Sequence, residues 1–259
     1  MISKNAILET NDLQIGKNVV IGDNVEIRCP EKIHIGDNSV LTKDIKINCT
    51  SFEAGEYLFM CDRVEIGRGG SYGPNSRVKI GKHVGIFEGT VINPSEEVEI
   101  GDDTGIGGDV MIWTHGAWLD VLQGFPADFG PVKIGSNVWL PARSVVLPHV
   151  TIGNDVVIGI NSIINRSLPD GCFAAGSPCK VIKENVYPKE LSQDEKTNII
   201  EDIIKDWLKL CEMKKITRTI KVRYESGKVF LNQSYNETIY NIEERNIQGY
   251  MNNVAEDLR

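Results

Sequence analysis

Several features that mark other classes of protein are scarce in this chain or missing from it. Its six cysteines include no Cys-x-x-Cys pair, so we expect reduced thiols that behave as small, mostly buried residues. No apolar run approaches the roughly 18 residues of a membrane span. The segment Met1 to Glu9 also lacks the basic and then apolar layout of a signal peptide. The sequence therefore predicts a cytoplasmic protein without a membrane span.

Basic residues are also outnumbered by acidic ones, 28 to 36. The formal net charge is −8 and the isoelectric point is near 5.1, which argues against a general attraction to nucleic acid or to anionic membranes. Any anionic ligand must therefore be met by a local cluster of Lys and Arg. At 259 residues the chain is long enough to bury a substantial core in one large domain or two smaller ones.

What the chain does contain is a six-residue repeat, in which an aliphatic residue is usually followed by Gly. The repeat starts at Ile15, returns at Ile80 and Ile100, and runs without a gap from 134 to 169. A period of six matches neither a strand nor a helix, which disfavours a βαβ protein and predicts a parallel β-helix. In such a coil the aliphatic residue points inward, Gly relieves crowding, and Asn or Asp near the corners tolerates left-handed conformations.

The spacing of the repeat locates two irregularities. Within 134–152 one turn of three units takes 18 residues, and earlier turns take 20, with the surplus in the third unit. The unit that begins at Ile112 is 22 residues long, so about 16 residues are inserted, at about 116–131. The stretch 47–79, which contains the Gly-rich segment 68–71, breaks the simple count, and we interpret it as a modified pair of turns.

The repeat divides the chain into a β-helix domain, residues 1–188, and a C-terminal extension, residues 189–259. A capping box at Ser192–Glu195 precedes apolar residues at helical spacing, which predicts a helix. Alternating residues from Ile220 to Leu231 predict a β-hairpin. This helix-plus-hairpin region is expected either to cover the open end of the coil stack or to contact the acceptor or a partner chain.

A specific resemblance covers residues 112–184 and extends more weakly over 15–111. The segments Pro131–Arg143, Val145–Gly153 and Ala174–Lys183 resemble the hexapeptide-repeat acyltransferases, in particular the maltose and galactoside acetyltransferase-like branch. The resemblance implies an all-β core folded as a left-handed parallel β-helix, with the inserted loop and a small α+β extension. It also implies acetyl-CoA as co-substrate, a small-molecule or glycan acceptor, and a homotrimer with active sites between subunits.

The same resemblance assigns roles to two residues near the insertion. His115 lies where the family has its general base, and a histidine suits removal of a hydroxyl proton near neutral pH. Trp139 matches an aromatic position beside the reaction centre, although it could equally serve as a core or interface residue. A third residue, Trp113, is expected to face the same cleft only because it lies two residues before His115.

Coenzyme A brings phosphates to an acidic protein, so the resemblance requires a local positive rim. We expect the pantetheine path to be lined by Ala142, Ile160 and Asn165, and the phosphates to be met on one groove edge by Arg166, Lys180 and Lys183.

Four functions remain in competition at this point. The first is an acetyl-CoA-dependent O-acetyltransferase that acts on a sugar or glycan hydroxyl, and the second is an N-acetyltransferase of amino sugars or nucleotide sugars. A γ-type carbonic anhydrase has the same fold but needs three converging histidines, two of them five residues apart. The four histidines here, at 34, 83, 115 and 149, do not have that spacing, so we expect no catalytic metal. A non-catalytic hexapeptide scaffold is disfavoured by His115 and the long insertion.

Overall fold

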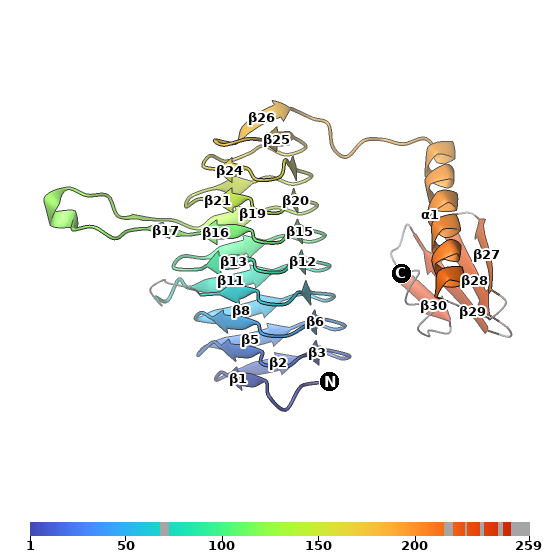
Figure 1. Ribbon diagram of the computed structural model, residues 1–259, viewed down its shortest axis with the longest axis horizontal. Coiled ribbons are helices and arrows are strands. Elements are labelled where there is room, and N and C mark those ends of the chain that lie inside the picture. Colours follow the sequence, from blue (N-terminus) through green and yellow to red (C-terminus); the bar gives the residue numbers. More distant parts are fainter. Residues whose placement is uncertain (68–72, 215–219, 226, 234–235, 243–245, 250–259) are drawn as a thin grey trace. The chain divides into compact units, whose positions relative to one another are not determined.

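The computed structural model describes residues 1–67, 73–214, 220–225, 227–233, 236–242 and 246–249 (Figure 1). The chain divides into two compact units, Met1–Pro188 and Lys189–Arg259.

The first unit is a left-handed parallel β-helix, as predicted, in which each turn adds one strand to each of three sheets (Figure 1). We number these sheets faces 1, 2 and 3 in the order in which the chain visits them. Face 1 contains β1 (Ile7–Glu9), β4 (Glu26–Arg28), β7 (Lys46–Asn48), β10 (Glu65–Ile66), β13 (Val91–Asn93), β16 (Met111–Trp113), β21 (Val145–Val146) and β24 (Ile163–Ile164).

The other two faces are built in the same way. Face 2 contains β2 (Leu13–Ile15), β5 (Lys32–Ile35), β8 (Ser51–Ala54), β11 (Arg77–Ile80), β14 (Val98–Ile100), β19 (Val132–Ile134) and β22 (Thr151–Ile152). Face 3 contains β3 (Val20–Ile21), β6 (Val40–Leu41), β9 (Phe59–Met60), β12 (Gly85–Ile86), β15 (Gly105–Ile106), β20 (Trp139–Leu140), β23 (Val157–Ile158) and β25 (Phe173–Ala175), and it ends with the antiparallel strand β26 (Lys180–Lys183).

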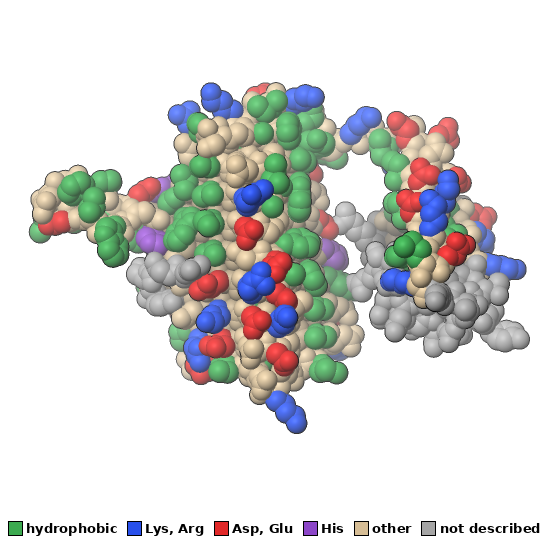
Figure 2. Space-filling view, in the orientation of Figure 1, with side chains coloured by type: hydrophobic (Ala, Val, Ile, Leu, Met, Phe, Trp, Pro, Cys, Tyr) green, Lys and Arg blue, Asp and Glu red, His purple; other side chains and the backbone are tan. Residues whose placement is uncertain are grey.

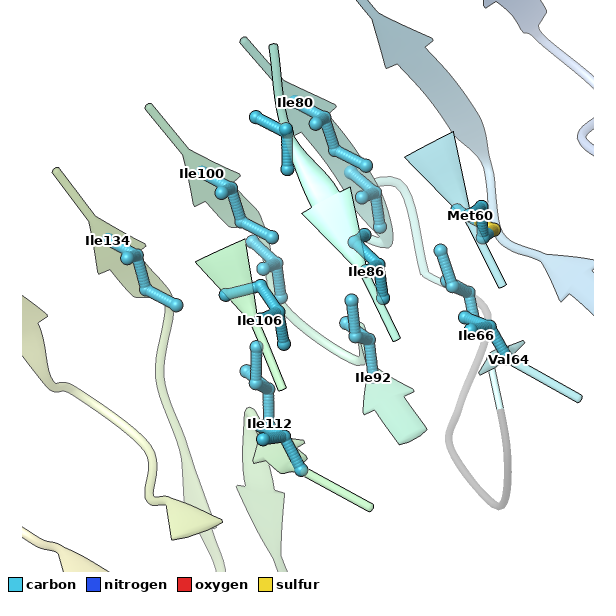
Figure 3. Packing of buried hydrophobic residues seen from close by; sticks show 14 of the residues in the cluster. Met60, Val64, Ile66, Ile80, Ile86, Ile92, Ile100, Ile106, Ile112 and Ile134 are labelled. Carbon is cyan, nitrogen blue, oxygen red and sulfur yellow. The ribbon is translucent and has the colours of Figure 1, made fainter. Parts of the chain in front are cut away.

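Inward-pointing aliphatic side chains form one column behind each face, which confirms the interpretation of the repeat (Figure 3). On face 2, Ile80 pairs with Ile100 and Ile100 pairs with Ile134, and all three side chains are buried. The cysteines also behave as predicted, because all six are free thiols and all but Cys61 are buried. A turn therefore buries its apolar residues only against the turns above and below it.

The corners use the left-handed backbone conformation that the Asn and Asp pattern predicts. Most residues with positive φ other than Gly are Asn or Asp, and successive corners are joined by side-chain hydrogen bonds. Asn18 donates to Asn38 at 3.0 Å, and Asn137 donates to Asp155 at 3.0 Å. A few corners carry other residues in this conformation, among them His83 and His149.

The outer surfaces of faces 2 and 3 differ in polarity. Face 2 carries an ion-pair ladder, in which Glu99 lies 3.1 Å from Lys133 and 3.9 Å from Lys79. Figure 2 shows basic and acidic side chains alternating along the middle of the β-helix, with hydrophobic side chains to either side. The outward positions of face 3 are apolar or Gly over successive turns: Val20, Val40, Phe59, Gly85, Gly105, Trp139, Val157 and Phe173. Face 3 therefore exposes an apolar strip of a kind that suits contact with another protein surface.

The corner between faces 1 and 2, which we call the 1–2 corner, accommodates both irregularities of the repeat. The register Lys46–Glu65–Val91 gives turns of 19 and 26 residues, and the Gly-rich segment 68–71 lies outside the described residues. The insertion after β16 forms an arm, residues 115–130, that projects from this corner (Figure 1). Its base is the antiparallel pair β17 (His115–Gly116) and β18 (Asp128–Phe129), and the 3₁₀ helix η1 (Val121–Gln123) lies near its tip.

The second unit combines one helix with a four-stranded antiparallel sheet. Helix α1 (Gln193–Met213) begins with the predicted capping box, in which the Ser192 backbone N–H donates to Glu195 and lowers the pKa of that carboxyl. The sheet contains β27 (Ile220–Glu225), β28 (Lys228–Gln233), β29 (Asn236–Asn241) and β30 (Asn246–Gly249), so the predicted hairpin is confirmed and two strands extend it.

Buried Trp207 and Cys211 of α1 belong to the same hydrophobic core as Leu231 and Tyr240 of the sheet, and burial raises the pKa of Tyr240 to about 12. Among the described residues, no helix is both long and apolar enough to cross a membrane.

The aliphatic columns can be tested with adjacent residues of β22. Ile152 is buried and Thr151 is exposed. We expect Ile152→Ala to lower the free energy of unfolding by about 2–5 kcal/mol, because the cavity is lined by neighbouring turns that cannot collapse into it. Thr151→Ala, the matched control, should change it by less than about 0.5 kcal/mol. Urea denaturation at fixed protein concentration measures both, and equal effects would contradict the inward column.

Candidate functional site

The backbone around His115 is fixed by the residue before it. Thr114 is fully buried at the end of β16, and its hydroxyl donates to the Asn93 carbonyl at 2.7 Å. The same hydroxyl accepts from the Glu96 backbone N–H at 3.0 Å. The Thr114 carbonyl accepts from the Gly130 N–H at 2.9 Å, which closes the base of the arm. Thr114 thus ties the start of the arm both to the turn below and to its own return strand.

The His115 ring is oriented by two side chains of the turn below. Its Nδ1 lies 2.8 Å from Asn93 Oδ1 and 3.1 Å from Ser95 Oγ, and the Ser95 hydroxyl donates to the same Asn93 oxygen at 3.1 Å. An amide oxygen only accepts hydrogen bonds, so this contact places the imidazole proton on Nδ1. Nε2 is then the atom whose lone pair can take up a proton from a substrate.

Two aromatic rings flank the half-buried imidazole. Phe129 of β18 stacks on His115, with ring centroids 5.6 Å apart and planes 21° apart. Trp113 contacts the His115 ring edge-on, with a centroid distance of 5.9 Å. The structure therefore places the Trp113 ring beside His115. The two rings suit a ligand with an apolar face.

Trp139 lies on a different side of the β-helix. It is on the outer surface of β20 in face 3, where its side chain is 44% exposed and its ring lies over Gly105 of the turn below. A Cβ on Gly105 would come within 2.7 Å of the Trp139 ring. Because the 1–2 corner is opposite face 3 in a three-sided coil, one chain does not bring Trp139 and His115 into a single site.

The six expected coenzyme residues fall into three places on one chain. Ala142 and Ile160 follow face-3 strands at the corner toward face 1, where Lys180 pairs with Ala175. Asn165 and Arg166 follow β24 at the 1–2 corner, two turns above the arm.

Lys183 pairs with Phe173 at the other end of β25. On a single chain, therefore, Arg166, Lys180 and Lys183 do not lie along one edge. The physical reason is that β26 runs antiparallel along β25, which puts Lys180 and Lys183 at opposite ends of one strand, while Arg166 lies at the 1–2 corner.

Three residues at this site did not emerge from the motifs: Asn93, Ser95 and Phe129. A signal for the first two was present in the repeat. The turn from β13 to β16 takes 20 residues, so Asn93 lies directly below Trp113, and Ser95 precedes His115 by the same step. Phe129 carried no comparable signal, because the pairing of the arm's two strands follows from its turn and not from the six-residue period.

The described residues contain no group of three or more His, Cys, Asp or Glu side chains placed to hold a metal ion. The four histidines lie on separate elements, and only His115 and His149 are at the base of the arm.

Comparison with known proteins identifies the family of the chain. The model of the bacterial transferase hexapeptide (six repeats) matches residues 131–166. A Saccharomyces cerevisiae protein, named provisionally as an acetyltransferase, is 35% identical over 149 residues, which are 56% of this chain and 70% of that protein. The chain belongs to the hexapeptide-repeat acetyltransferase family.

Two further relatives match over shorter stretches. The galactoside O-acetyltransferase of Escherichia coli is 34% identical over 116 residues, 44% of this chain and 56% of that enzyme. A Staphylococcus aureus relative matches at 44% identity, but the chain spans only 36% of its length. Among solved structures, the UDP-N-acetylglucosamine O-acyltransferase of Moraxella catarrhalis has a TM-score of 0.54 at 17% identity, covering 83% of this chain and 92% of that one. This last likeness supports the fold alone.

The contact between Gly105 and Trp139 yields a test. Gly105→Ala should displace the indole ring and change the tryptophan emission spectrum, because the added Cβ would overlap the ring. Gly85→Ala, one turn below on the same face, meets only Phe87 at 3.2 Å and should leave the spectrum unchanged. A spectral change that persists when Trp139 is replaced by Phe would show that another tryptophan is responsible.

Proposed function

We propose that the protein transfers the acetyl group of acetyl-CoA directly to a hydroxyl of a sugar or glycan, with His115 as general base. The observation that carries the proposal is the contact of His115 Nδ1 with Asn93 Oδ1, which leaves Nε2 as proton acceptor. In this reaction Nε2 takes the acceptor hydroxyl proton as the oxygen attacks the thioester carbonyl. The C–S bond then breaks, and the thiolate leaving group receives the proton from Nε2. Backbone amides would stabilise the oxyanion.

The acceptor class is supported by the neutral, aromatic surroundings of the base. Trp113 and Phe129 offer ring faces on which a sugar can stack, and Asn93 and Ser95 are uncharged. The name of the Escherichia coli relative, a galactoside O-acetyltransferase, points the same way. Turnover of simple glycosides, amino sugars and nucleotide sugars with acetyl-CoA tests this choice. A preference for amino groups would replace it with N-acetylation.

We further propose that the active site is shared between copies of the chain in a homotrimer. Face 3 of one copy carries Trp139, with Ala142, Ile160 and Lys180 at its edge, and the 1–2 corner of a neighbour would supply His115, Asn165 and Arg166. If face 3 of one copy packed against face 3 of a second copy, the arms of both copies would lie far from either Trp139. A heterologous contact that closes into a ring is needed instead. The exposed aromatic and aliphatic residues of the arm, Trp118 and Leu122 in particular, would be covered by the adjacent copy.

The role of His115 predicts a large loss of activity on its removal. We expect His115→Ala to lower kcat by roughly 10²–10⁴, with little change in the KM for acetyl-CoA, because a general base acts in the transition state. His34→Ala is the control, since His34 lies on the outer side of face 2. Steady-state kinetics measure both, and near-normal turnover by His115→Ala would end the assignment.

The shared site predicts that the protein's mass in solution is three times 28.8 kDa. Phe59, 39% exposed on face 3, provides a test. Phe59→Lys would place a charge in the contact and should yield monomers by light scattering, whereas Phe59→Leu should remain trimeric. Mixing the separate variants His115→Ala and Trp139→Ala under conditions that exchange subunits should restore turnover. A monomeric wild-type protein would exclude the shared site.

A further inference from the structure

A second histidine, His149, holds the return strand of the arm. Its Nε2 lies 2.8 Å from Asp128 Oδ1 in β18. Its ring also lies flush against Gly130, since a Cβ at that glycine would come within 2.2 Å of His149 Nδ1. His149 occupies the 1–2 corner of the next turn, with φ of 65°. The arm is therefore fastened to the stack above it as well as to the turn below.

The strand that His149 holds is the strand that packs on the His115 ring. Phe129 lies between Asp128 and Gly130, the two residues that His149 contacts, and it stacks on His115 at 5.6 Å. Phe129 is also the backbone partner of His115 in the β17–β18 pair. A shift of β18 away from the stack would move the Phe129 ring and with it one wall of the His115 site.

We propose that His149 is a positioning residue, which fixes the His115 imidazole by clamping the return strand of the arm through Asp128 and Gly130. This inference rests on the proposed role of His115 as general base. His149 itself does not touch the reacting atoms and acts through Phe129. We call His149, Asp128 and Gly130 the arm clamp.

The clamp is an exposed contact with a local effect. The side chains of His149 and Asp128 are both 58% exposed, and such pairs add little to global stability. Besides Asp128, the charged groups that face His149 line a cavity of about 310 Å³: Glu97, Glu99 and Lys133. Nε2 carries a proton, and can donate it to Asp128, both in one neutral tautomer of the imidazole and in the charged ring. The contact therefore does not require a charged histidine. Its loss should therefore loosen the arm and leave the β-helix folded.

The chain offers a matched control in another corner histidine. His83 also has a left-handed backbone, with φ of 54°, and its Nδ1 lies 3.4 Å from Asp103 Oδ1. It stacks on Tyr57 with centroids 5.0 Å apart. His83 is at the corner between faces 2 and 3, so replacing it removes a similar contact without touching the arm.

The experiment compares His149→Ala, Asp128→Ala, the double variant, His149→Gln and His83→Ala in the full chain. Hydrogen–deuterium exchange should rise in peptides from residues 115–130 for His149→Ala and Asp128→Ala, and stay unchanged for His83→Ala. In steady-state kinetics, kcat should fall by about 10-fold to 100-fold with the KM for acetyl-CoA unchanged, because a misplaced base weakens only the transition state. The double variant should match the single variants. His149→Gln, whose amide can donate from about the position of Nε2, should recover much of the activity.

The two measurements separate failure of the clamp from failure of the proposed function. Unchanged hydrogen–deuterium exchange of residues 115–130 in His149→Ala would overturn the clamp. Increased exchange with an unchanged kcat would overturn the proposed effect of the clamp on His115. If the wild-type protein acetylates no acceptor, the proposed function fails, while the exchange comparison still decides whether His149 holds the arm. A fall in kcat for His83→Ala as large as for His149→Ala would reduce the effect to general destabilisation and would contradict the inference.

Discussion

Each turn of this β-helix buries its aliphatic side chains only because another turn lies above and below it. The register between turns follows from that requirement, because inward residues such as Ile80, Ile100 and Ile134 must stack directly on one another. Backbone hydrogen bonds between turns enforce the same alignment, as where the Gly81 N–H meets the Ile100 carbonyl at 2.8 Å. Any chemistry must therefore be placed on outward positions and corners, where a side chain is free of the core.

The candidate site uses these positions in two ways. Asn93 and Ser95 orient His115 from the turn below, and His149 holds the arm from the turn above, so the position of His115 depends on residues of three successive turns. The apolar outer side of face 3, with Trp139, is the other half of the proposed site. It lies across the coil from His115, which is why a single chain carries the two halves on separate surfaces.

The fold was predictable because the aliphatic residues that form its core recur at a fixed period in the sequence. Ile134 and Ile152 are one turn apart in the chain and in the structure, and the insertion after Ile112 became an arm at the expected place. The capping box of α1 and the β27–β28 hairpin were local signals and were also correct. The distribution of Arg166, Lys180 and Lys183 was not predictable in this way. It depends on β26, which reverses direction at the end of the coil and so separates Lys180 from Lys183 along one strand.

The contacts of His149 were missed for a related reason, since its partner Asp128 belongs to the arm, which lies outside the repeat. The six-residue repeat predicts where residues of the coil lie, but it does not predict the positions of residues in an inserted segment. Asn93 lies within the repeat and was predictable from its period, whereas Phe129 lies in the arm and was not.

The 1–2 corner lengthens without any change in strand pairing on either side of it. Val91 stays opposite Met111 and Val98 stays opposite Val132, although the chain takes a long excursion between Trp113 and Val132. Loop length at this corner is thus uncoupled from the geometry of the stack, because a loop's closure cost grows only slowly with length. The corner therefore serves as a site of modular variation: segments of different length and composition can be exchanged there to alter recognition while the scaffold keeps its register.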